Sequence, residues 1–133
     1  VGLGSESGAA TFYRSNYDEL GSFNAGNAGA WEASVEDTVS VPVATVDGLV
    51  AADDLSPPDH LKIDVEGFEY EVLLGARETL RRHRPAVYLE VHDVPDTDRT
   101  RADHESALAE LLRDCDYRIR RRGSEWHCLP RDE

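Results

Sequence analysis

The chain has 133 residues and a strong excess of acid, with 27 acidic against 14 basic side chains and a formal net charge of −13. A surface this acidic repels phosphate backbones, so nucleic acid is excluded as an expected partner. No run of about 18 apolar residues is present, and we expect neither a membrane span nor a signal segment. Two cysteines without metal-ligand spacing predict reduced thiols in a cytoplasmic protein.

The basic residues are almost all arginine. Lysine occurs once, at Lys62, and arginine supplies the rest. Together with the acidity, this balance is typical of a chain kept soluble in strong salt, where charge repulsion is screened. It predicts a salt-adapted (halophilic) protein, and an ordinary acidic soluble domain is the plainer alternative.

The first 60 residues predict few regular elements. Short strands are indicated at residues 10–14 and, by clean alternation, at residues 38–45. Pro42 cannot donate a ladder hydrogen bond, so we expect the second strand to be an edge strand or to leave the sheet there. Residues 15–34 are rich in Gly, Asn, Ala and Ser and predict a loop, and a helical turn is expected at residues 46–52.

From residue 61 the pattern is strand, helix, strand, helix and hairpin. The expected elements are strands at 61–66 and 86–91, helices at 68–83 and 103–114, and antiparallel strands at 117–121 and 125–129. The first strand–helix–strand unit is a right-handed crossover, which makes its two strands parallel and places their C-terminal ends on one edge. The class indicated is α/β, with parallel strands followed by an antiparallel hairpin.

Ionisable side chains gather toward that edge. Period-two alternation puts Lys62, Asp64 and Glu66 on one face of the first strand, and places Glu90 and His92 on one face of the second. Central parallel strands are normally apolar on both faces, so these groups are expected to pair, to reach water or to bind a ligand.

Structural alternatives stand beside this interpretation. Asp64 or Glu66 could accept backbone N–H groups at the start of the following helix, and Lys62 could be an ion-pair partner of a nearby acid. Glu90 and His92 could form a structural pair at a strand end. His104 has no evident partner in the sequence pattern, and we expect it to be solvated.

The segments that carry these residues point to a family. The run LKIDVEGFEYEVLLGA, followed by RP at residues 84–85 and YLEVH at residues 88–92, resembles the FkbM-type methyltransferases, which use S-adenosylmethionine. The upstream segments VGL, GAA and TVDGL are similar to the family pattern as well. The likeness covers most of residues 1–92 and implies a partial Rossmann-like methyltransferase sheet.

What the resemblance implies is a single truncated domain over residues 1–133, the C-terminal portion of a methyltransferase-like domain whose N-terminal cofactor-binding half is missing. The expected reaction in a complete domain is O-methylation of a small-molecule or sugar hydroxyl. Asp64 and Ser22 are the expected cofactor-binding residues. The expected catalytic group is His92 as base, Glu90 orienting its ring, Asp64 and Glu66 at the strand end, and Lys62 paired with an acid.

Rival interpretations belong to other classes. The chain could be a non-catalytic remnant or interaction module that binds no cofactor and self-associates through an exposed sheet edge. Another α/β nucleotide binder is disfavoured because no phosphate-cradling loop is present. A metal held by Asp64, Glu66 and His92 is conceivable, but strand-end acids are weak evidence and no metal site is assigned.

Overall fold

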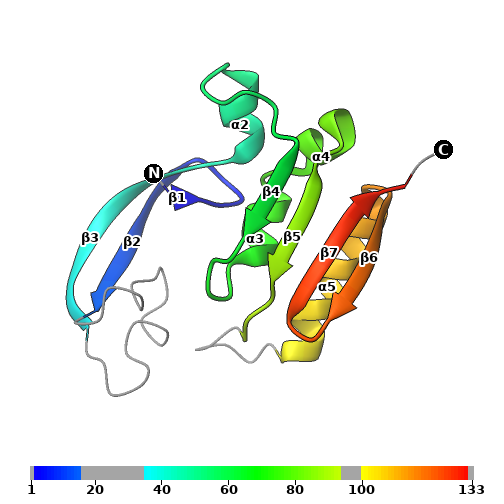
Figure 1. Cartoon of the computed structure of the whole chain (residues 1–133). Coiled ribbons are helices and arrows are strands. Elements are labelled where there is room, and N and C mark those ends of the chain that lie inside the picture. Colours follow the sequence, from blue (N-terminus) through cyan, green and yellow to red (C-terminus); the bar gives the residue numbers. More distant parts are fainter. Residues whose placement is uncertain (1, 16–34, 94–99, 132–133) are drawn as a thin grey trace.

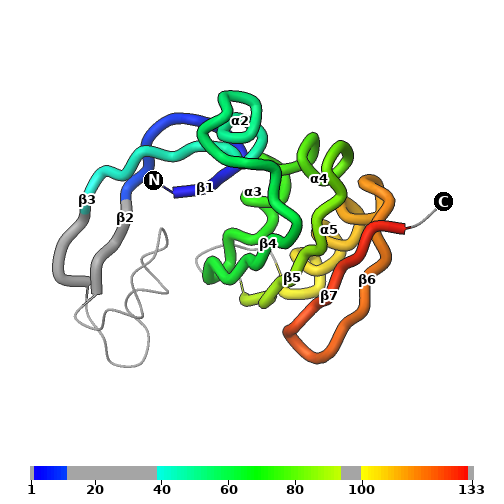
Figure 2. Tube along the Cα trace, turned by 45° about the horizontal axis from the view of Figure 1, so that its top comes forward, coloured from blue at the N-terminus to red at the C-terminus, as the bar shows by residue number. Residues whose placement is uncertain are grey.

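A computed structural model describes residues 2–15, 35–93 and 100–131 of the chain, and these form two sheets (Figure 1). The first sheet has the order β1-β3-β2 and contains β1 (Gly2–Leu3), β2 (Gly8–Ser15) and β3 (Val35–Ala44). The second has the order β4-β5-β7-β6 and contains β4 (His60–Ile63), β5 (Ala86–Glu90), β6 (Tyr117–Arg122) and β7 (Glu125–Pro130). Figure 2 follows the chain from the first sheet to the second through α2 (Val46–Ala51).

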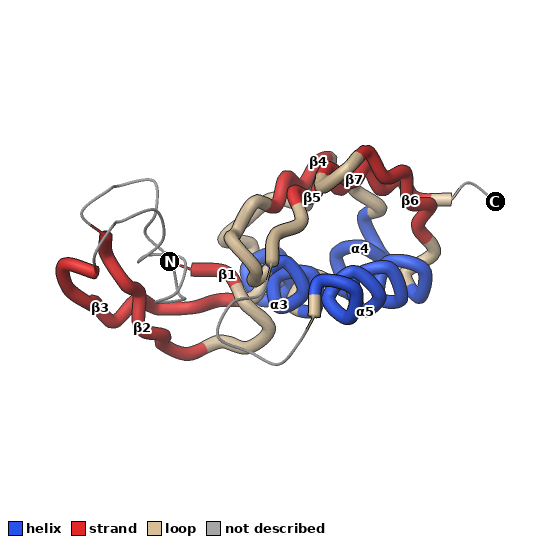
Figure 3. The backbone as a smooth tube through the Cα atoms, turned by 90° about the horizontal axis from the view of Figure 1, so that it is seen from below, coloured by secondary structure: helices blue, strands red, loops and turns tan. Residues whose placement is uncertain are grey.

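Three further helices cover one face of the second sheet, as Figure 3 shows: α3 (Glu69–Leu74), α4 (Arg77–His83) and α5 (Arg101–Asp114). The core lies between these helices and the sheet. Val87, Leu89 and Val91 alternate inward from β5 and its end, and they belong to one cluster with fully buried leucines of the helices, namely Leu73, Leu80, Leu108 and Leu112. None of the described helices is long and apolar enough to cross a membrane.

The second sheet confirms the expected α/β class. β4 and β5 are parallel neighbours, with Leu61 opposite Val87 and Ile63 opposite Leu89. β6 and β7 form the expected antiparallel hairpin, and β7 joins it to β5 in antiparallel register. Mixed parallel and antiparallel strands with helices on a sheet face are compatible with a partial Rossmann-like fold.

The single helix expected over residues 68–83 is wrong, because the chain breaks it at Gly75 and Ala76 into α3 and α4. The break lies where the chain meets the first sheet. A Cβ atom on Gly75 would lie 2.1 Å from the carbonyl oxygen of Gly4, and the Gly75 carbonyl accepts a hydrogen bond from the Asp47 backbone N–H at 2.9 Å. Close backbone approach therefore requires glycine here.

The edge-strand expectation from Pro42 is also wrong, since β3 is the middle strand of its sheet. The described pairing with β1 reaches only Val43 and Ala44. Pro42 lies just before that pair and is opposite Ala9 of β2 on its other side. Within the described residues Pro42 therefore has a partner strand on one side only.

Asp47 fixes the start of α4 from outside the helix. α4 has no side-chain cap of its own at Ala76. Instead, the Asp47 carboxylate accepts hydrogen bonds from the backbone N–H groups of Glu78 (3.1 Å) and Thr79 (2.8 Å), and from the Thr79 hydroxyl (2.7 Å). A carboxylate at a helix N-terminus is favourable for both the free N–H groups and the helix dipole.

We therefore expect Asp47→Ala to lower the free energy of unfolding by about 1–2 kcal/mol, because it leaves these donors without their acceptor. Urea denaturation followed by circular dichroism measures the loss. Asp54→Ala, at an exposed position just after α2, is the matched control. Equal losses for the two variants would contradict the capping role.

Candidate active site

The turn between β4 and α3 presents two acids at the edge of the second sheet. β4 ends at Ile63, earlier than the strand expected over residues 61–66, so Asp64 and Glu66 lie in the turn and not in the strand. Glu66 has a left-handed backbone with φ of 51°, and Gly67 follows with φ of 101°. These two residues reverse the chain into α3, and glycine accommodates such a conformation readily.

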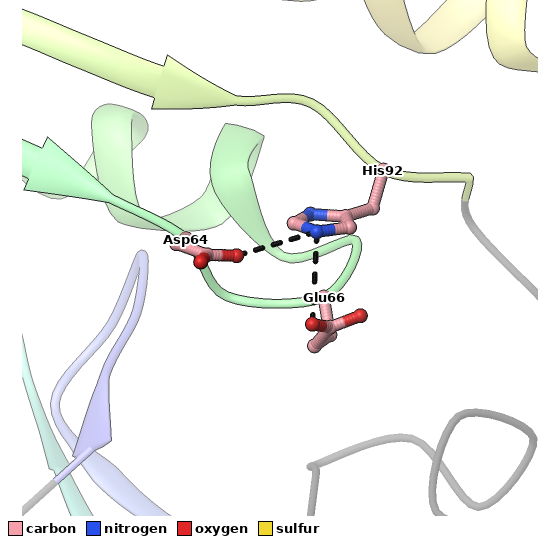
Figure 4. Close-up of side chains that lie close together, drawn as sticks. All are labelled: Asp64, Glu66 and His92. Carbon is pink, nitrogen blue, oxygen red and sulfur yellow. Dashed lines mark ion pairs between the residues drawn. The ribbon is translucent and has the colours of Figure 1, made fainter. Parts of the chain in front are cut away.

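His92 meets both acids from the neighbouring strand. It follows the end of β5, and because β4 and β5 are parallel, the residues after their C-terminal ends lie at one edge. Its Nε2 atom lies 3.2 Å from Oδ1 of Asp64 and 3.6 Å from Oε1 of Glu66 (Figure 4). The side chains of Asp64 and Glu66 are nearly half exposed, whereas the His92 side chain is 22% exposed. The ring is therefore more buried than the two carboxylates.

A third acid, Glu69, holds the other side of the ring. Glu69 is fully buried in the first turn of α3. Its Oε1 atom accepts a hydrogen bond from the His92 backbone N–H at 2.7 Å and lies 3.1 Å from the His92 Nδ1 atom. Its Oε2 atom lies 4.0 Å from Nε2 of His104 on α5, which is also fully buried.

Sequence reasoning missed Glu69, although a signal was present. Glu69 precedes Val72, Leu73 and Ala76 at spacings of three, four and seven, which places it on the buried face of the helix. An acid on an apolar helix face has to find a buried partner. The same reasoning corrects the expectation that His104 is solvated, since His104 shares that buried space.

The surroundings of His92 raise its pKa. Burial by itself lowers the pKa, but the hydrogen bond that the ring donates to Glu69 and the negative charges of Glu66, Glu69 and Asp64 outweigh it. The net result is a pKa above the ordinary value of 6.5. The imidazolium form is thus stabilised by carboxylates on both ring nitrogens.

Lys62 and Glu90 lie elsewhere. They line a hollow together with Tyr88, Glu125 and His127. Because Val87 and Leu89 belong to the core, alternation along β5 puts Glu90 on the opposite face of the sheet. Glu90 is opposite Glu125 of β7, and the acid that meets Nδ1 of His92 is Glu69. The expectation that Glu90 orients His92 is therefore wrong. Ser22 lies outside the described residues.

The cluster of Asp64, Glu66 and His92 has the residue types of a metal site. One atom from each lies within 4.8 Å of the others, a spacing at which one cation would contact all three. A protonated His92 ring supplies a positive charge at the same place. In both arrangements, a bound metal ion or a protonated His92 ring, a positive charge lies beside the carboxylates of Asp64 and Glu66 at the sheet edge.

Because folding raises the pKa of His92, the folded chain binds this proton more tightly than the unfolded chain does. The resulting stabilisation is fully present below about pH 6.5 and is lost as the pH rises through the folded-state pKa. We expect His92→Gln to cost more free energy of unfolding at about pH 5.5 than at about pH 9, as measured by urea denaturation. The exposed His60→Gln is the control, and an equal cost of His92→Gln at both pH values would contradict the ion-paired state.

A comparison with known protein families identifies one that matches the chain. The family described as "Methyltransferase FkbM domain" matches residues 1–119, which include every described residue of the cluster around His92. No curated protein and no solved structure matches the chain. Because the family match spans most of the sequence, the chain belongs to the FkbM methyltransferase family.

Proposed function

We propose that this chain carries the proton-accepting part of an S-adenosylmethionine-dependent O-methyltransferase, acting within a complete domain on a small-molecule or sugar hydroxyl. The observation that carries the proposal is His92, fixed between Glu69 and the half-exposed Asp64 and Glu66 at the C-terminal edge of two parallel strands. Ligands of open α/β sheets bind outside this edge.

The acids at the edge fit one part of the cofactor. S-adenosylmethionine supplies a methyl group on a positively charged sulfonium. Asp64 and Glu66 offer two carboxylates at the surface, and negative charge beside a sulfonium is favourable. Asp64, which directly follows β4, is the residue we assign to this contact. Binding of the adenosine part of the cofactor requires further residues of the domain, and we propose that they lie beside β4.

β4 is the end strand of its sheet within the described residues, and its outer edge is open. An open edge of a parallel strand is a ready site for pairing with another strand. We propose that a strand of the N-terminal half of the domain pairs there and completes the cofactor pocket. The same open edge would serve a non-catalytic module that binds a partner chain or a second copy, and this is the alternative function.

His92 has the geometry of a general base. A hydroxyl nucleophile must lose its proton as it attacks the methyl carbon, and Nε2 lies beside Asp64 at the C-terminal edge of the sheet, where we place the acceptor. His92 must be neutral to take that proton. Its raised pKa therefore moves the acid limb of the activity profile above pH 6.5.

In the protein that carries the complete domain, we expect His92→Gln to lower kcat by about 10²–10⁴-fold, the usual contribution of a general base. Transfer is measured as release of S-adenosylhomocysteine with a panel of sugars and small hydroxyl compounds. Glu66→Gln removes a charge that raises the pKa of His92, so it should move the acid limb to lower pH.

The matched control is His127→Gln, since His127 lies exposed on β7 away from this edge. Turnover by His92→Gln equal to that of the control would remove His92 from the mechanism. A dependence on added divalent cation, abolished by His92→Gln, would replace the base role with a metal role. Absence of both transfer and S-adenosylhomocysteine binding in the complete domain would favour the non-catalytic module.

A further inference from the structure

We infer that Glu69 is a positioning residue, which places the ring proton of His92 on Nδ1 and turns Nε2 toward the acceptor. The importance of this arrangement for turnover rests on the methyl-transfer function proposed above. The arrangement itself is a property of the described chain and can be tested without transfer.

The first step concerns the hydrogen bonds of one carboxylate oxygen. Oε1 of Glu69 accepts the backbone N–H of His92 at 2.7 Å and lies 3.1 Å from Nδ1 of the same residue. An ionised carboxylate has no hydrogen to donate, so a hydrogen bond at Nδ1 requires the proton to be on the ring. Holding the backbone and the ring at one atom also restricts the rotation of the His92 side chain.

The second step concerns the burial of Glu69. Its side chain is fully buried, and an unpaired buried carboxylate is costly. His92 from the end of β5 and His104 from α5 approach its two oxygens. The hydrogen bonds of Oε1 with His92 are what compensates the buried acid on α3, and His104 lies 4.0 Å from the other oxygen.

The third step concerns what Nε2 then presents. Nδ1 makes a hydrogen bond with the buried Glu69, whereas Nε2 meets the half-exposed Asp64 and Glu66 only as ion pairs of the protonated ring. In the neutral ring the proton is therefore expected on Nδ1, and Nε2 carries the lone pair. In the proposed reaction the proton of the acceptor hydroxyl moves to Nε2, so its O–H bond breaks and an N–H bond forms. The acceptor oxygen bonds to the methyl carbon, and the bond from that carbon to sulfur breaks. The charged groups around the resulting imidazolium are Asp64 and Glu66 from the β4–α3 turn and Glu69 from α3.

Nitrogen-15 NMR of the histidine rings tests the assignment on the 133-residue chain itself. At about pH 9, where the ring is mostly neutral, we expect His92 to show the tautomer protonated at Nδ1. Glu69→Gln should weaken this preference and raise the share protonated at Nε2, and Glu69→Asp, which keeps the charge, should restore part of it. Glu110→Gln, an exposed acid on α5, is the matched control and should leave the spectrum of His92 unchanged.

The spectrum of the wild-type chain is decisive even if a variant fails to fold. A neutral His92 ring protonated at Nε2 would overturn the inference, and so would an unchanged tautomer in a folded Glu69→Gln variant. In the complete domain, Glu69→Gln should lower kcat by about 10²-fold with little change in KM, because it acts through the base. The expected tautomer without any transfer activity would instead refute the proposed function and leave the positioning arrangement intact.

Discussion

The buried carboxylate of Glu69 is the constraint on which the active-site region depends. A buried carboxylate has to be compensated inside the protein, and here the backbone N–H and the ring of His92 meet one of its oxygens, while His104 lies 4.0 Å from the other. These contacts join the start of α3, the end of β5 and the first turns of α5 around one group. Glu69 thereby connects the helix layer to the C-terminal edge of the sheet, and the His92 ring is held in one orientation.

The orientation of His92 determines which groups meet at the C-terminal edge of β4 and β5. Parallel pairing of β4 and β5 brings the β4–α3 turn and His92 together, and the left-handed turn at Glu66 and Gly67 keeps both acids at the surface (Figure 4). One histidine then lies between one buried and two half-exposed carboxylates. This is an environment for holding positive charge, which suits the sulfonium methyl donor that we propose for this member of a methyltransferase family. The open edge of β4 is where the proposed domain would be completed.

The sequence predicted the elements better than it predicted the contacts. Alternation and helical spacing are local, so the parallel strands, α5 and the hairpin were found, and so were Asp64, Glu66 and His92 as one group. The break at Gly75 was missed because it depends on the approach of Gly4, 71 residues away in the sequence. Glu69 was missed because the helix face was defined by its apolar residues alone, and Glu90 was preferred because strand alternation placed it on the same face as His92. Which acid reaches a ring is decided by packing, which periodicity does not describe.

A double-mutant cycle between Glu69 and His92 tests the central claim most directly. The free energies of unfolding of the wild type, Glu69→Gln, His92→Gln and the double variant are measured in urea at about pH 6, where the ring is mostly charged. The account predicts strong coupling, with the double variant less destabilised than the sum of the single variants by more than about 1 kcal/mol. Additive losses, with a coupling energy near zero, would contradict it.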